Sequence, residues 1–319
     1  VRPKDLKETS RFLEKGGQES MLCAGGTDVL GLMKNAVVAP QKLVNLKSIP
    51  ELNAIKYTPG KGLKIGALVT IAEIVEHPII VEKYPILQQA AQEVASPQLR
   101  NVGTLGGNIC QRPRCWYFRG EFDCLRKGGE LCYAVDGQNK YHCIVGGGPC
   151  YIVHPSDMAV ALLALDAKNY IFKGKKSRTV LLSEFFVLPE QDVLHENILQ
   201  PGEIVTELQI PELKANVKSG FVKFKERGAW DFAVVSVAGV IEKNGHVIQS
   251  GRIAFGGVAP APWQEPTINQ KLQGMSISKD SFSALAQSSF KNAEPRSMNA
   301  YKVPLARNLM QRLLTELVA

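Results

Sequence analysis

The stretch "LCAGGTDVL", residues Leu22–Leu30, places two adjacent glycines between an apolar strand-like run and a helix-like run. Gly25 and Gly26 can adopt positive φ and allow a ligand to approach the backbone closely. Thr27 or Asp28 can cap the following helix, whose free N–H groups favour an anion. The stretch therefore predicts either a phosphate-binding turn or a connection that uses its glycines for geometry alone.

A second diglycine turn, "NVGTLGGNI", follows at Asn101–Ile109. Gly106 and Gly107 offer bare backbone. The flanking Thr104 and Asn108 offer a hydroxyl and an amide. Two such turns could hold a pyrophosphate from two sides, as a dinucleotide would require, or they could be unrelated. Neither turn has the GxGxxG or Walker A pattern, so a Rossmann NAD site and a P-loop are not indicated.

Composition indicates a globular chain with more than one lobe. Its 319 residues exceed the usual size of a single core, and its content of 45% hydrophobic and 21% charged residues is ordinary for a globular protein. The net charge of +8 is dispersed, and the densest basic run, "KGKKSR", lies between two strand-like segments. That position predicts a solvated hairpin turn rather than a nucleic-acid surface. No apolar run approaches the roughly 20 residues that span a bilayer, and the charged start predicts no signal peptide.

Periodicity divides the chain into three regions. Residues 1–57 alternate between helix-like and strand-like segments, and residues 58–203 mix strands and helices around a cysteine-rich stretch. From residue 204 onwards, alternating strand patterns precede helix-like segments. The pattern predicts a mixed α and β protein with an antiparallel sheet near its carboxyl end.

Six motifs occur in the order that is found in a known family. The chain resembles the flavin-binding medium subunits of the xanthine dehydrogenase family of molybdenum hydroxylases over nearly its whole length. Relatives in this family include carbon monoxide dehydrogenases, aldehyde oxidoreductases and 4-hydroxybenzoyl-CoA reductase. The motifs are "AGGTDVL", "LKIGALVTIAEI", "RNVGTLGGNI", "HPSDMAVALLALDA", "KFKERGAWDFAVVSVAG" and "RIAFGGVAPAP".

The resemblance implies an α+β fold of the vanillyl-alcohol oxidase type, with FAD held between two lobes. Residues 1–57 would form the first FAD-binding lobe and residues 58–203 the second. Residues 204–319 would form a flavoprotein domain with a small antiparallel sheet and a three-helix bundle.

The resemblance also implies the FAD site residues. Asp157 of "HPSD" matches a position that contacts the flavin, and Lys223 matches a lysine near the isoalloxazine. Without the resemblance, Asp157 would be interpreted as a helix cap and Lys223 as a solvated strand residue. The pyrophosphate would be held by the two turns, whose matching residues are Leu22, Cys23, Ala24, Gly25, Gly26, Thr27, Asp28 and Val29 in the first and Thr104, Gly106, Gly107 and Asn108 in the second.

Six of the seven cysteines lie within the 41 residues from Cys110 to Cys150. Disulfides would require an oxidising compartment. Zinc sites usually contain closely spaced cysteine pairs, which are missing here, although His142 beside Cys143 keeps zinc open. An iron–sulfur cluster requires four thiolates, and the six basic against four acidic residues of the stretch would help to hold an anion. Spacing alone leaves all three open.

The family resemblance favours the cluster. Asn108 and Asp157 are 49 positions apart, much farther than in most flavin subunits of the family. The insertion, about residues 110–152, resembles one that carries a [4Fe–4S] cluster in 4-hydroxybenzoyl-CoA reductase and in some bacterial aldehyde oxidoreductases. Cys110 and Cys23 are expected to be small buried residues. The implied ligands are Cys115, Cys124, Cys132 and, as the fourth, Cys150, with Cys143 as its rival.

We therefore expect an FAD-containing electron-transfer subunit of an oxidoreductase complex, with no catalytic side chain of its own. The resemblance implies a large subunit with molybdenum cofactor, a small subunit with [2Fe–2S] centres, and a ferredoxin-like or other electron partner. We expect a cytoplasmic location, or export together with a partner. Two alternatives are a self-sufficient FAD oxidoreductase of the same fold and a zinc-stapled scaffold without redox function.

Overall fold

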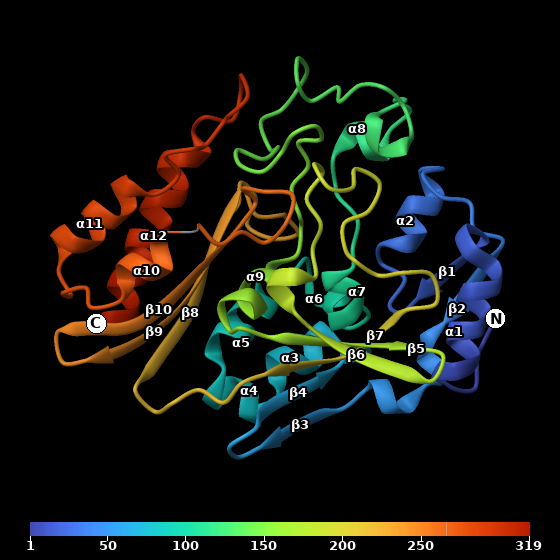
Figure 1. The fold of residues 1–319 in the computed structure, drawn as a ribbon, viewed down its shortest axis with the longest axis horizontal. Helices are drawn as coiled ribbons and strands as arrows, with labels where there is room; N and C mark the ends of the chain where they lie inside the picture. Colours follow the sequence, from blue (N-terminus) through green and yellow to red (C-terminus); the bar gives the residue numbers. More distant parts are fainter. Residues whose placement is uncertain (266) are drawn as a thin grey trace.

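The computed structural model describes residues 1–265 and 267–319. Within these residues, the fold is built around three β-sheets of two, five and three strands. Figure 1 shows the amino-terminal elements at one end of the molecule, the five-stranded sheet in the middle and the carboxyl-terminal helices at the other end. Among the described residues, no helix has the length and apolar character needed to cross a membrane.

The amino-terminal lobe has the predicted order of helix, strand, helix and strand. Helix α1 (Leu6–Gly16) packs against the parallel strands β1 (Ser20–Cys23) and β2 (Lys42–Asn45). Asp5 caps α1 by accepting a hydrogen bond from the Glu8 amide at 2.8 Å. Between the strands lies α2 (Val29–Lys34), so the first diglycine turn joins β1 to α2 as expected.

The second lobe contains an antiparallel sheet in the order β3-β4-β7-β5-β6. Strands β5 and β6 form a hairpin whose turn includes Gly174 at φ 60°, which confirms the prediction for the basic run. The strands are β3 (Ile55–Thr58), β4 (Gly62–Gly66), β5 (Lys168–Lys173), β6 (Lys176–Leu181) and β7 (Ile204–Ile210).

The helices of the second lobe form its core with the sheet. Helix α9 (Asp157–Ala164) is buried along its whole length and packs against α5 on one side and against strands of the third sheet on the other. The other helices are α3 (Ile71–Glu76), α4 (Pro78–Lys83), α5 (Pro85–Gln92), α6 (Pro97–Arg100) and α7 (Leu105–Ile109).

The described part of the carboxyl-terminal domain has an antiparallel sheet in the order β10-β9-β8 and three helices. Helix α12 packs on β8 and β9, and α10 packs on β10. The expected sheet and helices are therefore present. Their bounds are β8 (Val217–Phe224), β9 (Val235–Asn244), β10 (Val247–Gly256), α10 (Ile268–Leu272), α11 (Lys279–Ser288) and α12 (Lys302–Val318).

The sheets place two boundaries differently from the predicted regions. Strand β7 begins at residue 204 but pairs with β4 and β5, so this part of the chain still belongs to the second lobe. Strand β3 includes residues on both sides of position 57 and pairs with β4. The carboxyl-terminal sheet starts only at β8. Periodicity missed this because it does not reveal which partner a strand chooses.

The cysteine segment, residues 110–152, is mostly irregular and contains α8 (Trp116–Arg119) and the 3-10 turn η4 (Leu125–Lys127). In Figure 1 it arches over the top of the molecule, above α7 and α9. Buried Lys302 of α12 donates from Nζ to the carbonyl oxygens of Tyr141 and Gly257, both at 2.7 Å. The segment is thereby attached to the carboxyl-terminal domain.

Candidate functional site

A cleft of about 1280 Å³ lies where the two diglycine turns meet. Its volume exceeds the roughly 300–1,000 Å³ of most small-molecule sites, so an extended ligand such as a dinucleotide can enter. Cys23 and Lys223 are predicted site residues that do not line it. The predicted residues that do are Leu22, Ala24, Gly25, Gly26, Thr27, Asp28, Val29, Thr104, Gly106, Gly107, Asn108 and Asp157.

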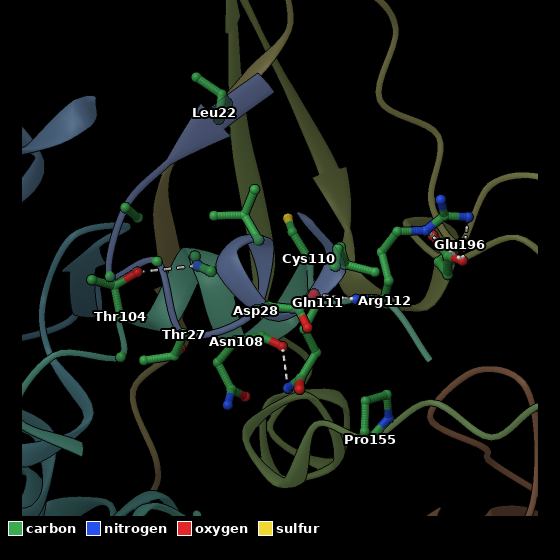
Figure 2. Close-up of a pocket in the computed structure, with 18 of the residues that line it drawn as sticks. Leu22, Thr27, Asp28, Thr104, Asn108, Cys110, Gln111, Arg112, Pro155 and Glu196 are labelled. Atoms are coloured by element: carbon green, nitrogen blue, oxygen red, sulfur yellow. Dashed lines mark hydrogen bonds and ion pairs between the residues drawn. The ribbon is translucent and has the colours of Figure 1, made fainter. Parts of the chain in front are cut away.

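The glycines allow the two turns to approach each other closely, as Figure 2 shows around Thr27 and Thr104. A β-carbon on Gly25 would lie 2.2 Å from the carbonyl oxygen of Val102, in the second turn. One on Gly106 would lie 2.8 Å from the β-carbon of Ala67. Both contacts are shorter than a side chain tolerates, so these two positions require glycine.

The two turns differ in their free backbone donors. Among the described residues, no acceptor is found for the N–H groups of Gly25, Gly26, Thr27 and Asp28. Unpaired N–H groups that border a cleft fit an anionic ligand such as a diphosphate. The first turn thus supplies donors that an FAD diphosphate would use.

The second turn uses its amides within the protein. The N–H groups of Leu105 and Gly106 donate to carbonyl oxygens at 2.9 Å, and that of Gly107 donates to the Thr104 hydroxyl at 3.2 Å. Thr104 is the cap of α7 and is buried. The second turn therefore forms a rigid wall of the cleft rather than a second set of free amide donors.

The start of α9 is held to the second turn. The Ser156 hydroxyl accepts from the Ala159 amide at 2.9 Å and donates to Oδ1 of Asn108 at 2.5 Å. Ser156, rather than Asp157, is therefore the helix cap. The arrangement leaves the Asp157 carboxylate for other contacts.

Asp157 and Lys223 form a buried ion pair at 2.7 Å. Lys223 also donates to the carbonyl oxygen of Glu93 at 2.9 Å, and its side chain is completely shielded from solvent. It lies behind Asp157 and positions this carboxylate at the cleft. Burial raises the pKa of Asp157, and the Lys223 ammonium opposes that rise.

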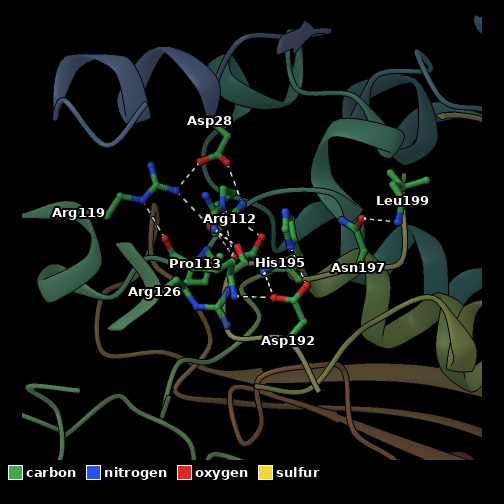
Figure 3. Close-up of polar contacts among 11 residues, drawn as sticks. Asp28, Arg112, Pro113, Arg119, Arg126, Asp192, His195, Asn197 and Leu199 are labelled. Carbon is green, nitrogen blue, oxygen red and sulfur yellow. Dashed lines mark hydrogen bonds and ion pairs between the residues drawn. The ribbon is translucent and has the colours of Figure 1, made fainter. Parts of the chain in front are cut away.

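Asp28 does not cap α2, which has no side-chain cap. Its carboxylate accepts from the Arg112 amide at 2.9 Å and from Nη2 of Arg119 at 2.7 Å (Figures 2 and 3). Nη2 of Arg114 lies 2.8 Å from the same carboxylate. Three residues of the cysteine segment therefore converge on one side chain of the first turn.

Glu196 is a buried acid that joins two further arginine side chains. Its carboxylate lies 3.1 Å from Nε of Arg112 and 2.6 Å from Nη1 of Arg126. Arg126 is 3% exposed, and its Nε and Nη2 have no hydrogen-bond partner among the described residues. Figure 3 shows Arg112 and Arg126 in this network near Asp192 and His195. Sequence reasoning did not single out Glu196, because its partners are about 70 to 84 positions away.

None of the seven cysteines forms a disulfide bond in the described chain. Cys132 and Cys150 are hydrogen-bonded, which lowers the pKa of Cys132 to about 6 and raises that of Cys150. The pKa of Cys115 is raised to about 11 by burial, with smaller contributions from the nearby Cys150 and Cys124. The four predicted ligands thus lie near one another. No group of three or more His, Cys, Asp or Glu side chains in the described chain is arranged to hold a single metal ion.

The remaining cysteines have different surroundings. Buried Cys143 has its pKa raised to about 12 by burial, and Lys302 opposes this rise. Cys110 lines the cleft, and burial raises the pKa of its thiol to about 12. Cys110 and Cys23 are each partly exposed rather than fully buried.

Family comparison explains why the cleft and the turns occur together. Residues 1–213 match the family described as "FAD binding domain in molybdopterin dehydrogenase", and residues 220–317 match "CO dehydrogenase flavoprotein C-terminal domain". The chain belongs to the FAD-binding family of molybdopterin dehydrogenases. This flavoprotein is an FAD-binding medium subunit of the molybdenum hydroxylase type, and its relatives are oxidoreductase subunits.

Individual relatives resemble this flavoprotein over most of their length. The aldehyde oxidoreductase FAD-binding subunit PaoB of Escherichia coli is 35% identical over 298 residues, which cover 92% of this chain and 90% of PaoB. The carbon monoxide dehydrogenase medium chain of Hydrogenophaga pseudoflava is 26% identical and covers 98% of this chain and 94% of its own. A solved structure of carbon monoxide dehydrogenase from that organism matches with a TM-score of 0.79 at 25% identity and covers 99% of this chain and 96% of its own.

Proposed function

We propose that this chain is an electron-transfer subunit that holds FAD in the cleft and a [4Fe–4S] cluster on Cys115, Cys124, Cys132 and Cys150. The observation that carries the proposal is the position of these thiols in one segment that also lines the FAD cleft with Arg112, Arg114 and Arg126. When bound, FAD supplies the exchange of electrons. The chain binds and orients the cofactors and needs no nucleophilic side chain.

The free amides of the first turn would hold the diphosphate, while Asp157 would meet the flavin end. Lys223 keeps the Asp157 carboxylate in place at 2.7 Å. Because Lys223 is buried behind Asp157, it would act through this carboxylate rather than by contact with FAD. Its role would be to position Asp157.

The cluster is supported by the neighbours of the thiols. Cys132 and Cys150 share a hydrogen bond, and both influence or are influenced by the nearby Cys115. The Arg126 guanidinium lies beside Cys150 and lowers the pKa of its thiol, so it can stabilise anionic sulfur. Among the other candidate ligands, only Cys150 contributes to the shifted pKa of Cys143, which lies near Lys302, so we retain Cys150 as the fourth ligand.

The relatives favour an aldehyde as the substrate of the complex. PaoB is named as an aldehyde oxidoreductase subunit, and a glyceraldehyde dehydrogenase medium chain from Sulfolobus acidocaldarius is 27% identical over 280 residues. We propose oxidation of an aldehyde at a molybdenum-containing large subunit, with a small [2Fe–2S] subunit between that centre and FAD. A ferredoxin-like protein would exchange electrons at the cluster.

Metal and flavin analysis of the anaerobically purified protein tests the proposal. We expect one FAD and about four irons with matching sulfide per chain. Flavin without iron would remove the cluster from the proposal, and zinc without flavin would favour the scaffold alternative.

Single Cys→Ser variants test the ligand set. C115S, C124S, C132S and C150S should lose iron, whereas the matched variants C110S and C143S should retain it. Loss of iron from C143S with retention in C150S would assign the fourth position to Cys143. Turnover of an aldehyde by the isolated chain would favour a self-sufficient enzyme.

A further inference from the structure

Asp28 has an unusual set of partners for a residue of a diphosphate-binding turn. It lines the cleft, yet its carboxylate is bound by donors of the cysteine segment: the Arg112 amide, Arg114 and Arg119. Without these donors, a carboxylate at the cleft would repel an anionic ligand and would lose its own hydrogen bonds. The segment therefore neutralises a charge that the turn itself introduces.

The donors are held in place before any ligand enters. Arg119 also donates from Nε to the carbonyl oxygen of Pro113 at 2.8 Å, and its side chain is only 10% exposed. Arg112 is tied to Glu196 and donates to the carbonyl oxygen of Leu194 at 2.7 Å. Side chains that are already fixed lose little conformational freedom when they support the turn.

A hydrophobic contact joins the same two parts of the chain. Leu32 of α2 is buried in one cluster with Tyr117, Phe118 and Cys124 of the cysteine segment. Helix α2 follows directly on the first diglycine turn. Polar and apolar contacts together connect the turn and its helix to the segment.

We propose that the cysteine segment braces the first diglycine turn through Asp28, so that FAD binding and the folded state of this segment stabilise each other. Arg112, Arg114 and Arg119 are then positioning residues for the diphosphate. The inference rests on the proposed binding of FAD at this turn. Because coupling between two sites is reciprocal, bound FAD must also suppress opening of the segment.

Binding measurements on R119M and D28N test the brace, with FAD and riboflavin as probes. R119M should raise the Kd for FAD by about 5- to 150-fold, the usual range of coupling between sites, and leave the Kd for riboflavin unchanged because riboflavin has no diphosphate. In the D28N background, R119M should have a much smaller effect. The matched control is R312M, which breaks an exposed ion pair with Glu316 on α12.

Two results would overturn the brace. One is an FAD Kd for R119M equal to that of the wild type. The other is an equal loss of FAD and riboflavin with a lower melting temperature, which indicates general damage. A wild-type chain that binds no FAD would instead refute the proposed function.

Hydrogen exchange on the wild-type protein gives a test that needs no variant. Arg119 of α8 and the following Gly120 line neither the cleft nor the adjoining cavity at Asp157, so FAD would not shield their amides directly. Exchange of the Arg119 and Gly120 amides, which are bonded to Cys115 and Trp116, should slow when FAD is added. Peptides from the β5–β6 hairpin, which does not line the cleft, serve as the control. Unchanged exchange in α8 with saturating FAD would contradict the proposed coupling.

Discussion

Replacement of Gly25 by alanine should weaken FAD binding by forcing the two diglycine turns apart. The added methyl carbon would lie 2.2 Å from the carbonyl oxygen of Val102, 2.9 Å from its carbonyl carbon and 3.1 Å from Cα of Gly103. All three are backbone atoms, so no side chain can rotate away. The turn itself must move.

The geometry sets the size of the expected effect. The turns must separate by roughly 0.8 Å to relieve the shortest contact, and a gap of that size forfeits a quarter to a half of the packing attraction along the interface. Overpacking of this kind costs about 1–3 kcal/mol. If the whole cost is borne by the bound state, the Kd for FAD rises about 5- to 150-fold.

Flavin fluorescence titration measures the Kd, and urea unfolding of the FAD-free protein measures the remaining stability. G245A is the matched control, because Gly245 lies in the β9–β10 hairpin at φ 57° with no atom within 4 Å of an added β-carbon. It should lower stability through backbone strain and leave the Kd unchanged. A wild-type Kd for G25A would refute the close approach of the turns as the reason for this glycine.

Three further predictions concern buried charges. K223M should lower the free energy of unfolding by about 3–5 kcal/mol, because it leaves the Asp157 carboxylate buried without its partner; urea unfolding measures this, and a loss below 1 kcal/mol would contradict it. Burial lowers the pKa of Lys302 from 10.5 to about 7, so the unfolded state binds more protons than the folded state between these two pH values. The stability of the wild type relative to K302M should therefore rise between pH 7 and pH 9, by up to about 1.4 kcal/mol per pH unit. A flat difference between the two proteins would show that Lys302 remains charged. Burial also lowers the pKa of His142 and of His154 from 6.5 to about 4. The free energy of unfolding should therefore fall as the pH drops from 6.5 to 4, by up to about 1.4 kcal/mol per pH unit for each histidine. A constant free energy of unfolding over this range would show that the two buried histidines are not neutral.

Local sequence patterns predicted the elements around the cleft but not their long-range partners. Gly25 and Gly106 were identified because strand–turn–helix boundaries with paired glycines are local signals. The contacts of Asp28 with Arg112 and Arg119 join positions 84 and 91 apart, and no local pattern encodes them. Composition predicts that the basic residues of the cysteine segment balance the charge of a cluster, whereas several of them bind carboxylates in the structure.

Long-range contacts also decide which residue caps α9 and which strands pair with β7, so local sequence patterns did not predict either feature. In "HPSD", Ser156 and Asp157 are both good capping residues, and only the position of Lys223 across the fold decides which of them turns away from the helix end. The pairing of β7 with β4 and β5 depends on a sheet whose strands are separated by the cysteine segment. Family motifs therefore predict the fold class, whereas the network of charges depends on contacts that only the three-dimensional structure brings together.

The hydrogen bond between Ser156 and Asn108 closes the cysteine segment at its base. The two helices that flank the segment, α7 and α9, are in contact there, so the intervening chain begins and ends at nearly the same place. Lengthening such a loop twofold costs only about 0.6 kcal/mol in closure entropy. Chain entropy therefore sets little limit on the length of this segment, and its removal would be opposed by the loss of the partners of Asp28 rather than by loop closure.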